Sequence, residues 1–312
     1  MKRFFATTVT VLMASLAGLT AQAPEIIKNV RGAIAANDFA LAAKTLETYR
    51  ANNGVTPEML EALSWMGRGA LAAKDLDGAE KYARETYQLA TAELKRRKLD
   101  QEARLPIALG AAIEVLGQVD AQRGARTEAV SFLRKEMETY KGTSIEKRIQ
   151  KNINLLSLEG QPAPAIDVAE YLGPKPPTIA ALKGKVVLMF FWAHWCGDCK
   201  AQAPVLADLA STYGDRGLVI FAPTQRFGYV AGGKPAAPEE ETRYIDQVRE
   251  ASYPVLAGQP VPLSAANHMR FGVSTTPTLV LVDRAGVIRL YHPGQMTKEQ
   301  LEPLVRSLVV GS

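Results

Sequence analysis

The pattern of hydrophobic and polar residues divides the chain near residue 160. Between about residues 25 and 157, apolar side chains recur at intervals of three and four, as a helix requires for one buried face. The recurring positions are Leu41, Thr45, Leu46 and Tyr49, followed by Leu60, Leu63, Met66 and Ala70. Ala, Leu, Glu, Lys and Arg predominate throughout this stretch. The first half is therefore predicted to be entirely helical.

Three segments of this half look like one interhelical turn, namely Asn37–Ala42, Lys74–Ala79 and Gly124–Ala129. Gly67 and Gly117 each precede the alanine of their unit by twelve residues, the spacing of a tetratricopeptide motif. The resemblance is partial, because the units are irregularly spaced and most of the expected aromatic positions differ. We interpret residues 24–157 as a tetratricopeptide-like helical domain. A plain helical bundle packed on the second half is the alternative.

Beyond residue 160 the pattern becomes one of short apolar runs separated by Pro, Gly and helical stretches. The predicted strands are Val186–Phe191, Leu218–Ala222, Thr278–Asp283 and Val287–Tyr291. The predicted helices are Cys199–Tyr213, Glu239–Glu250 and Lys298–Val309. Strands that alternate with helices predict an α/β sandwich over residues 160–312. An insertion at residues 222–254, rich in Gly and aromatic residues at its start, suits either a loop over the active site or a solvent-exposed loop.

Residues 1–23 have the pattern of a signal peptide. Lys2 and Arg3 precede an apolar stretch from Phe4 to Leu19, and small residues follow it up to Ala23. The stretch is short for a membrane span, so an uncleaved anchor is the weaker alternative. The leader therefore predicts export to the periplasm.

The composition limits the number of domains and the class of protein, but it indicates no particular chemistry. The 312 residues suggest about two domains, and 47% hydrophobic with 22% charged residues is ordinary for a globular protein. The formal net charge of +5 is too small to indicate a nucleic-acid partner. The run Lys95–Lys98 is best interpreted as a solvated helix end.

Cys196 and Cys199 are the only cysteines of the chain. A structural disulfide across so short a loop would stabilise little, because the effect grows with loop length. A zinc or copper(I) site would need further ligands, and the three histidines are not at ligand spacing. A redox pair has a mechanism. At a helix N-terminus, unpaired N–H groups and the helix dipole stabilise the first thiolate, while the second cysteine can resolve a mixed disulfide.

The residues around this pair resemble the active-site segment of the thioredoxin superfamily. The segment reads Phe191-Trp192-Ala193-His194-Trp195-Cys196-Gly197-Asp198-Cys199-Lys200. Pro204 lies where that family kinks its active-site helix, and Thr276-Pro277 resembles the segment that holds the family's cis-proline. Gly160–Pro164 and Leu182–Lys185 are similar to the lead-in of the TlpA/ResA branch of exported thiol–disulfide oxidoreductases.

This resemblance implies a thioredoxin-fold α/β domain in which Cys196 attacks and Cys199 resolves. It implies active-site support from the neighbouring residues Trp195, Gly197, Asp198, Thr276, Pro277 and His194, and a cis bond before Pro277. No cofactor beyond the redox-active disulfide is expected, and no metal. The expected partners are disulfide-containing protein substrates and an unidentified thiol electron donor, with protein docking on the helical domain.

Two positions depart from the thioredoxin pattern. Phe190 replaces the family's buried acid, so proton transfer at Cys199 must use water, Asp198, His194 or a carboxylate from elsewhere in the fold. Asp198 replaces a proline, and its carboxylate should disfavour the adjacent thiolate. Solvated positions are the alternatives for Asp198 and for His194.

Two rival functions remain open at this point. A peroxiredoxin shares the fold but needs Thr before its reactive cysteine, where this chain has Trp195. A binding protein would instead use the Cys pair for copper(I), or would act as a chaperone through the helical domain. A thiol–disulfide oxidoreductase of the TlpA type is the leading interpretation, while its substrate, its electron donor and its net direction are left open.

Overall fold

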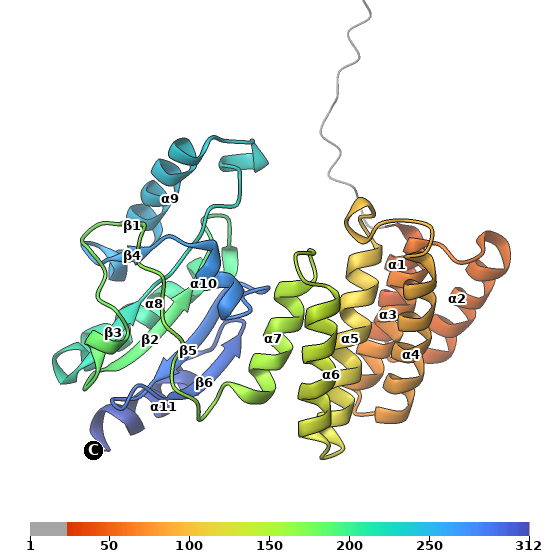
Figure 1. Ribbon diagram of the computed structural model, residues 1–312, viewed down its shortest axis with the longest axis horizontal. Helices are drawn as coiled ribbons and strands as arrows, with labels where there is room; N and C mark the ends of the chain where they lie inside the picture. Colours follow the sequence, from red (N-terminus) through yellow and green to blue (C-terminus); the bar gives the residue numbers. More distant parts are fainter. Residues whose placement is uncertain (1–23, 312) are drawn as a thin grey trace, which may run out of the picture.

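A computed structural model describes residues 24–311. The predicted signal peptide, residues 1–23, lies outside the described residues. The described chain has a helical part and an α/β part, joined where the hydrophobic pattern changes (Figure 1). The predicted fold class is confirmed: an all-helical region precedes a thioredoxin-like α/β domain.

The helical part consists of seven α-helices within residues 25–157. They are α1 (Glu25–Ala35), α2 (Phe39–Asn53), α3 (Pro57–Ala72), α4 (Leu76–Glu93), α5 (Leu105–Gln122), α6 (Arg126–Thr139) and α7 (Glu146–Ser157). Consecutive helices are antiparallel neighbours in a row that begins at α1 and α2 and reaches the α/β part at α7 (Figure 1).

The three predicted turns are the connections within helix pairs α1–α2, α3–α4 and α5–α6. Each contains one residue with positive φ: Asn37 at 59°, Lys74 at 62° and Gly124 at 90°. Asp38 and Asp75 then cap the next helix, each accepting a hydrogen bond from a backbone N–H three residues on. The same local geometry therefore recurs in successive units, as the sequence spacing predicts.

The glycines of the repeat lie where helices approach closely. A Cβ on Gly67 would lie 3.4 Å from the backbone nitrogen of Ala83, and one on Gly117 would lie 3.0 Å from the side chain of Leu133. Leu60, Leu63, Met66 and Ala70 are buried as predicted. The prediction is wrong for Leu41, which is 52% exposed. It lies on the first helix pair, where the described part of the chain supplies no further helix to cover it.

The α/β part contains a mixed sheet of four strands in the order β3-β2-β5-β6. These strands are β2 (Val186–Phe191), β3 (Leu218–Phe221), β5 (Thr278–Val282) and β6 (Ile288–Pro293), with β2 parallel to β3 and antiparallel to β5. A two-stranded ribbon pairs β1 (Tyr171–Leu172) with β4 (Val261–Pro262). The main helices are α8 (Gly197–Tyr213), α9 (Pro238–Ser252), α10 (Ala265–Arg270) and α11 (Lys298–Val310).

Alternate residues of β2 face two different layers. Leu188 and Phe190 pack in one hydrophobic cluster with residues of α8, α9 and α11, including Cys199. Met189 and Phe191 pack in a second cluster with Phe271, beyond the end of α10, and with residues from the segment that leads into the sheet. The sheet is thus covered on both faces, which explains why all six residues of β2 are buried.

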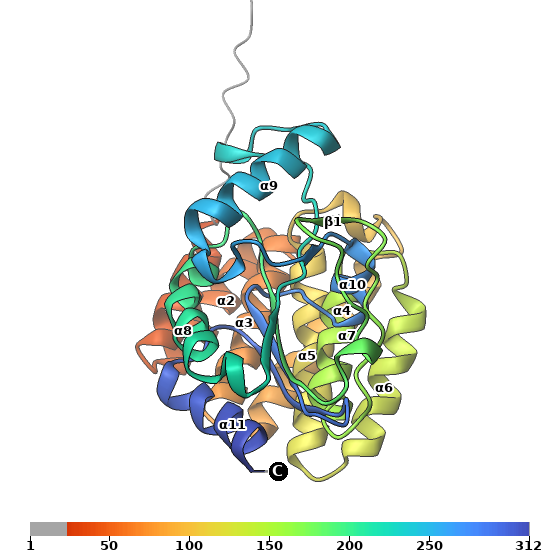
Figure 2. The same cartoon turned by 90° about the vertical axis from the view of Figure 1, so that its left-hand side faces the viewer.

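Helix α7 joins the two parts. It lies beside β6 and α10 (Figures 1 and 2). Gly272, with φ of 58°, sits so close that a Cβ there would lie 2.4 Å from the backbone nitrogen of Lys151. Asn154 donates a hydrogen bond to the carbonyl of Arg270, and Glu159 accepts one from the backbone N–H of Tyr291. The contact between the parts therefore combines close backbone packing with polar bonds, while each part keeps hydrophobic clusters of its own.

Candidate active site

Cys196 and Cys199 form a disulfide at the start of α8, with the Cα atoms 5.2 Å apart. Cys196 is the N-cap of the helix, and its sulfur accepts a hydrogen bond of 3.0 Å from the backbone N–H of Cys199. The helix begins two residues earlier than the sequence predicted. Cys199 is fully buried and Cys196 is 3% exposed, so both cysteines are buried in this oxidised state.

The residues next to the two cysteines are exposed, unlike the cysteines themselves. Trp195 is 50% exposed and packs edge-on against Phe227, with ring centroids 5.5 Å apart. Gly197 and Asp198 are also exposed. Asp198 therefore occupies the solvated position that the sequence left open. An exposed carboxylate is well screened by water, so its influence on the neighbouring sulfur is weak.

The Thr276–Pro277 bond is cis, as predicted, and directly precedes β5. The strand register pairs Thr278 with Phe191. Because β5 runs antiparallel to β2, this register brings Pro277 beside the end of β2 that leads to Cys196. Thr276 is half-buried and Pro277 is buried. The two segments singled out in the sequence, more than 75 residues apart, thus meet at one edge of the sheet.

His194 is buried, which contradicts the alternative of a solvated loop residue. Its ring is surrounded edge-on by the rings of Phe227, Tyr229 and Tyr244, at centroid distances of 5.2 to 5.6 Å. Its Nε2 atom lies 3.3 Å from Oε1 of Glu241. Burial lowers the pKa of His194, and the hydrogen bond with Glu241 opposes that shift. The imidazole is therefore neutral at pH 7.

Glu241 is a buried carboxylate on α9 that the sequence analysis did not single out. Besides His194, it accepts hydrogen bonds from the backbone N–H groups of Phe227 and Gly228. One carboxylate thus ties α9 and the start of the insertion to the residue two positions before Cys196. The insertion covers His194 and Trp195, so it is a loop beside the active site rather than a merely solvent-exposed one.

Phe190 occupies the position of the missing acid and is fully buried in the same hydrophobic cluster as Cys199. Tyr253 packs on it with ring centroids 5.9 Å apart, and burial raises the pKa of the Tyr253 hydroxyl. Gln202, one turn along α8 from Cys199, is also buried and accepts a hydrogen bond from the backbone N–H of Met296. The surroundings of Cys199 are therefore apolar, with neutral polar groups in place of the acid.

His268 is a second buried histidine, and sequence reasoning gave it no role. It lies on α10 with its ring edge-on to Phe191, at 5.5 Å, and to Phe227, at 6.3 Å. Burial, assisted by the charge of Lys147, lowers the pKa of His268 to about 3. Among residues 24–311, no three His, Cys, Asp or Glu side chains are grouped as ligands for a metal ion. No helix in that range is long and apolar enough to cross a membrane.

Comparisons with known proteins concern the α/β part. Residues 158–307 match the Redoxin family. The thioredoxin-like protein YneN of Bacillus subtilis is 28% identical over 144 residues, which cover 46% of this chain and 76% of that protein. The thiol:disulfide interchange protein DsbE of Pseudomonas aeruginosa is 29% identical over 161 residues, covering 49% and 78%. The thiol-disulfide oxidoreductase ResA of Bacillus anthracis is 27% identical over 151 residues, covering 48% and 78%.

Proposed function

We propose that this chain, whose residues 158–307 form a Redoxin-family domain of the thiol–disulfide oxidoreductase type, exchanges disulfides in protein substrates through Cys196 and Cys199. The observation that carries the proposal is the disulfide at the N-terminus of α8, at the sheet edge that also holds Pro277. We further propose that residues 1–23 export the protein to the periplasm. An oxidising compartment supplies disulfides for such an enzyme to act on.

In the reducing direction, the thiolate of Cys196 attacks one sulfur of a substrate disulfide. A mixed disulfide forms and the first substrate sulfur leaves as a thiolate. Cys199 then loses its proton and attacks the sulfur of Cys196, which releases the second substrate thiolate. Two electrons have passed from the cysteine pair to the substrate, and the enzyme is left with the Cys196–Cys199 disulfide. A thiol electron donor must reduce that disulfide before the next turnover.

The geometry around the pair supports this division of roles. The Cys199 N–H already points at the sulfur of Cys196, and the same bond together with the helix dipole would stabilise the Cys196 thiolate. Cys199 has neither advantage, because it lies one turn inside the helix and is surrounded by apolar side chains. It is suited to attack only once a mixed disulfide is held beside it. Both sulfurs belong to the protein, so the exchange requires no other cofactor.

Reduction of insulin by dithiothreitol, followed by turbidity, tests the proposal. The wild-type chain should accelerate the reaction, and Cys196→Ser should abolish the acceleration. Asp215→Asn is the control, since it changes an exposed carboxylate beyond the end of α8 and should retain activity. Equal activity in the wild-type and Cys196→Ser proteins would contradict the proposal. Expression with and without residues 1–23, followed by fractionation of the cells, tests export separately.

A further inference from the structure

The odd-numbered helices of the helical part carry neighbouring charged side chains and one tryptophan, which together we call the basic strip. Its residues are Arg31 on α1, Glu61, Trp65 and Arg68 on α3, Arg104 and Glu114 at the start and in the middle of α5, and Lys147, Arg148 and Lys151 on α7. Residues 61, 65 and 68 are spaced to share one face of α3, and residues 147, 148 and 151 lie within one turn of α7. The strip therefore crosses successive helices rather than following one.

Trp65 fixes two cations at one end of the strip. The guanidinium carbon of Arg31 lies 4.3 Å from the centroid of the Trp65 ring, and that of Arg68 lies 3.8 Å from it. A guanidinium held against an indole face is attracted by the ring quadrupole and loses rotamer freedom. The two arginines are thus ordered before any ligand arrives.

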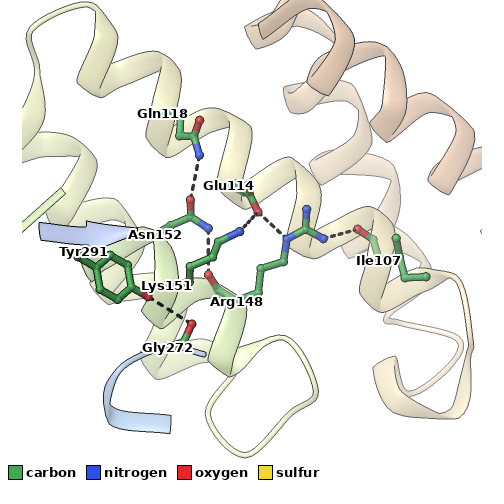
Figure 3. A network of polar contacts seen from close by, with 8 residues as sticks. All are labelled: Ile107, Glu114, Gln118, Arg148, Lys151, Asn152, Gly272 and Tyr291. Atoms are coloured by element: carbon green, nitrogen blue, oxygen red, sulfur yellow. Dashed lines mark hydrogen bonds and ion pairs between the residues drawn. The ribbon is translucent and has the colours of Figure 1, made fainter. Parts of the chain in front are cut away.

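Glu114 organises the other end (Figure 3). Its carboxylate accepts hydrogen bonds of 2.6 Å from Arg148 and 3.1 Å from Lys151. Burial raises the pKa of Glu114, but these two cations outweigh that effect and bring the pKa to about 2. Arg148 also donates to the backbone carbonyl of Ile107. One carboxylate therefore forms ion pairs with two basic residues of α7.

The carboxylates of the strip are too few to neutralise its basic side chains. It contains six basic residues against the carboxylates of Glu61 and Glu114, whereas the whole chain has 37 basic and 32 acidic residues. The pKa of Arg68 is lowered by burial and next by the nearby charge of Arg148, and the two carboxylates do not offset these effects. Burial likewise lowers the pKa of Lys147. An added anion would relieve this repulsion.

The α7 end of the strip lies toward the candidate active site. Lys147 is close enough to His268 for its charge to contribute to the lowered pKa of that histidine. The ring of His268 contacts Phe227, and Phe227 contacts Trp195 beside Cys196. Lys151 packs against Gly272, which begins the segment that leads to Pro277. A ligand bound along the strip would therefore have its α7 end on the side that faces α10 and the segment leading to Pro277.

We propose that the basic strip binds an extended acidic segment of the protein substrate and so presents the substrate's disulfide to Cys196. The proposal rests on the proposed thiol–disulfide exchange and names the partner's chemistry. Neighbouring helix axes are typically about 8–10 Å apart, so four odd-numbered helices span roughly 25–30 Å. An extended chain covers that distance in about eight or nine residues at about 3.3 Å each. A free carboxylate or phosphate would occupy only one end of the strip.

The probe is a synthetic peptide of about ten residues, rich in Glu, with one cysteine joined by a disulfide to thionitrobenzoate. A matched peptide has Gln in place of every Glu. Release of thionitrobenzoate by the reduced full-length protein, held in excess over the peptide so that one reaction per protein suffices, gives a second-order rate constant equivalent to kcat/KM for each peptide. The acidic peptide should be reduced about tenfold more efficiently at low ionic strength, and added salt should erase the advantage because it screens the charges.

The double variant Arg31→Gln/Arg68→Gln should remove this preference and leave kcat/KM for the Gln peptide unchanged. The matched control is Lys95→Gln/Lys98→Gln, which removes the same charge from the exposed turn after α4 and should keep the preference. Lys147→Gln leaves the contacts of Arg31 and Arg68 with the Trp65 ring intact, and it should also weaken the preference for the acidic peptide. Circular dichroism verifies that each variant is folded.

Equal reduction of the two peptides by the wild-type protein would overturn the proposal, and so would an equal loss of preference in the control variant. Failure to reduce either peptide would contradict the proposed function instead. In that case, fluorescence anisotropy of a labelled Glu peptide without a disulfide still tests the strip. If the Arg31→Gln/Arg68→Gln variant binds this peptide about tenfold more weakly than the wild-type protein does, the proposal is supported. Equal affinity of the two proteins for the peptide refutes it.

Discussion

Glu241→Gln removes one negative charge from the junction between the insertion and the active-site segment while preserving side-chain volume. Oε1 of Glu241 faces both Nε2 of His194 and the N–H of Phe227, and Oε2 accepts from the N–H of Gly228 at 2.8 Å. A glutamine has only one oxygen. Its amide NH₂ group must therefore face one of these donors, and the remaining bonds lose their charge.

The expected cost follows from these bonds. A hydrogen bond to a charged group contributes about 1.5–3 kcal/mol, and an unsatisfied buried donor costs about 1–3 kcal/mol. One bond lost and two weakened should lower the free energy of unfolding by about 2–4 kcal/mol. Glu239→Gln is the matched control, because it makes the same charge change at an exposed position of the same helix. It should change stability by less than about 0.5 kcal/mol.

Urea unfolding followed by tryptophan fluorescence and by circular dichroism measures the difference. A double-mutant cycle with His194→Phe measures the interaction energy between Glu241 and His194. This substitution keeps an aromatic ring among the three neighbouring aromatic residues. The effect of Glu241→Gln should shrink in that background by at least about 0.5 kcal/mol. If Glu241→Gln is as stable as Glu239→Gln, or if the cycle shows no coupling to His194, the reasoning about this buried carboxylate is refuted.

Two further predictions concern pH and domain structure. Because the pKa of His268 falls from 6.5 to about 3 on folding, the unfolded chain binds more protons below pH 6.5, and stability should be lost as pH falls from 6.5 toward 3, by up to about 1.4 kcal/mol per pH unit. His268→Phe should flatten this part of a urea-midpoint profile; an unchanged slope would contradict the assignment. A chain that begins at Leu158 should fold and reduce a small disulfide, because it keeps the hydrogen bond from Tyr291 to Glu159 and the pairing of Gly160 with Ile288. An unfolded, inactive fragment by circular dichroism would show that the two parts do not fold independently.

Elements with a strong local signal could be predicted closely from the sequence. The strand Val186–Phe191 has the predicted bounds because an unbroken apolar run of that length suits a strand buried on both faces. The repeat turns were identifiable because Asn37 and Gly124 suit the positive φ of two of them, and an aspartate follows at the helix cap of two. The redox pair and the cis bond before Pro277 could be predicted because few other roles fit a Cys-x-x-Cys after an apolar strand together with a Thr-Pro before another strand.

Features that depend on distant contacts could not be predicted. The burial of His194 follows from Glu241, which is 47 residues away on the insertion, and no local pattern distinguishes that glutamate from its exposed neighbours. The basic strip could not be predicted for the same reason. Its cations come from helices spread over more than 100 residues, whereas the only basic run in the sequence, Lys95–Lys98, follows the end of α4.

The central claim is that Cys196 attacks and Cys199 resolves, and trapping of mixed disulfides tests it most directly. Each single Cys→Ser variant is incubated with an oxidised protein substrate, and the products are separated by non-reducing electrophoresis and identified by mass spectrometry. Cys199→Ser should accumulate a complex linked through Cys196, because no second thiolate is present to release it. Cys196→Ser should accumulate none, since its remaining sulfur lies inside α8, without the N-cap position and the backbone N–H that stabilise a thiolate at Cys196. Equal trapping by both variants, or trapping by Cys196→Ser alone, would contradict the account.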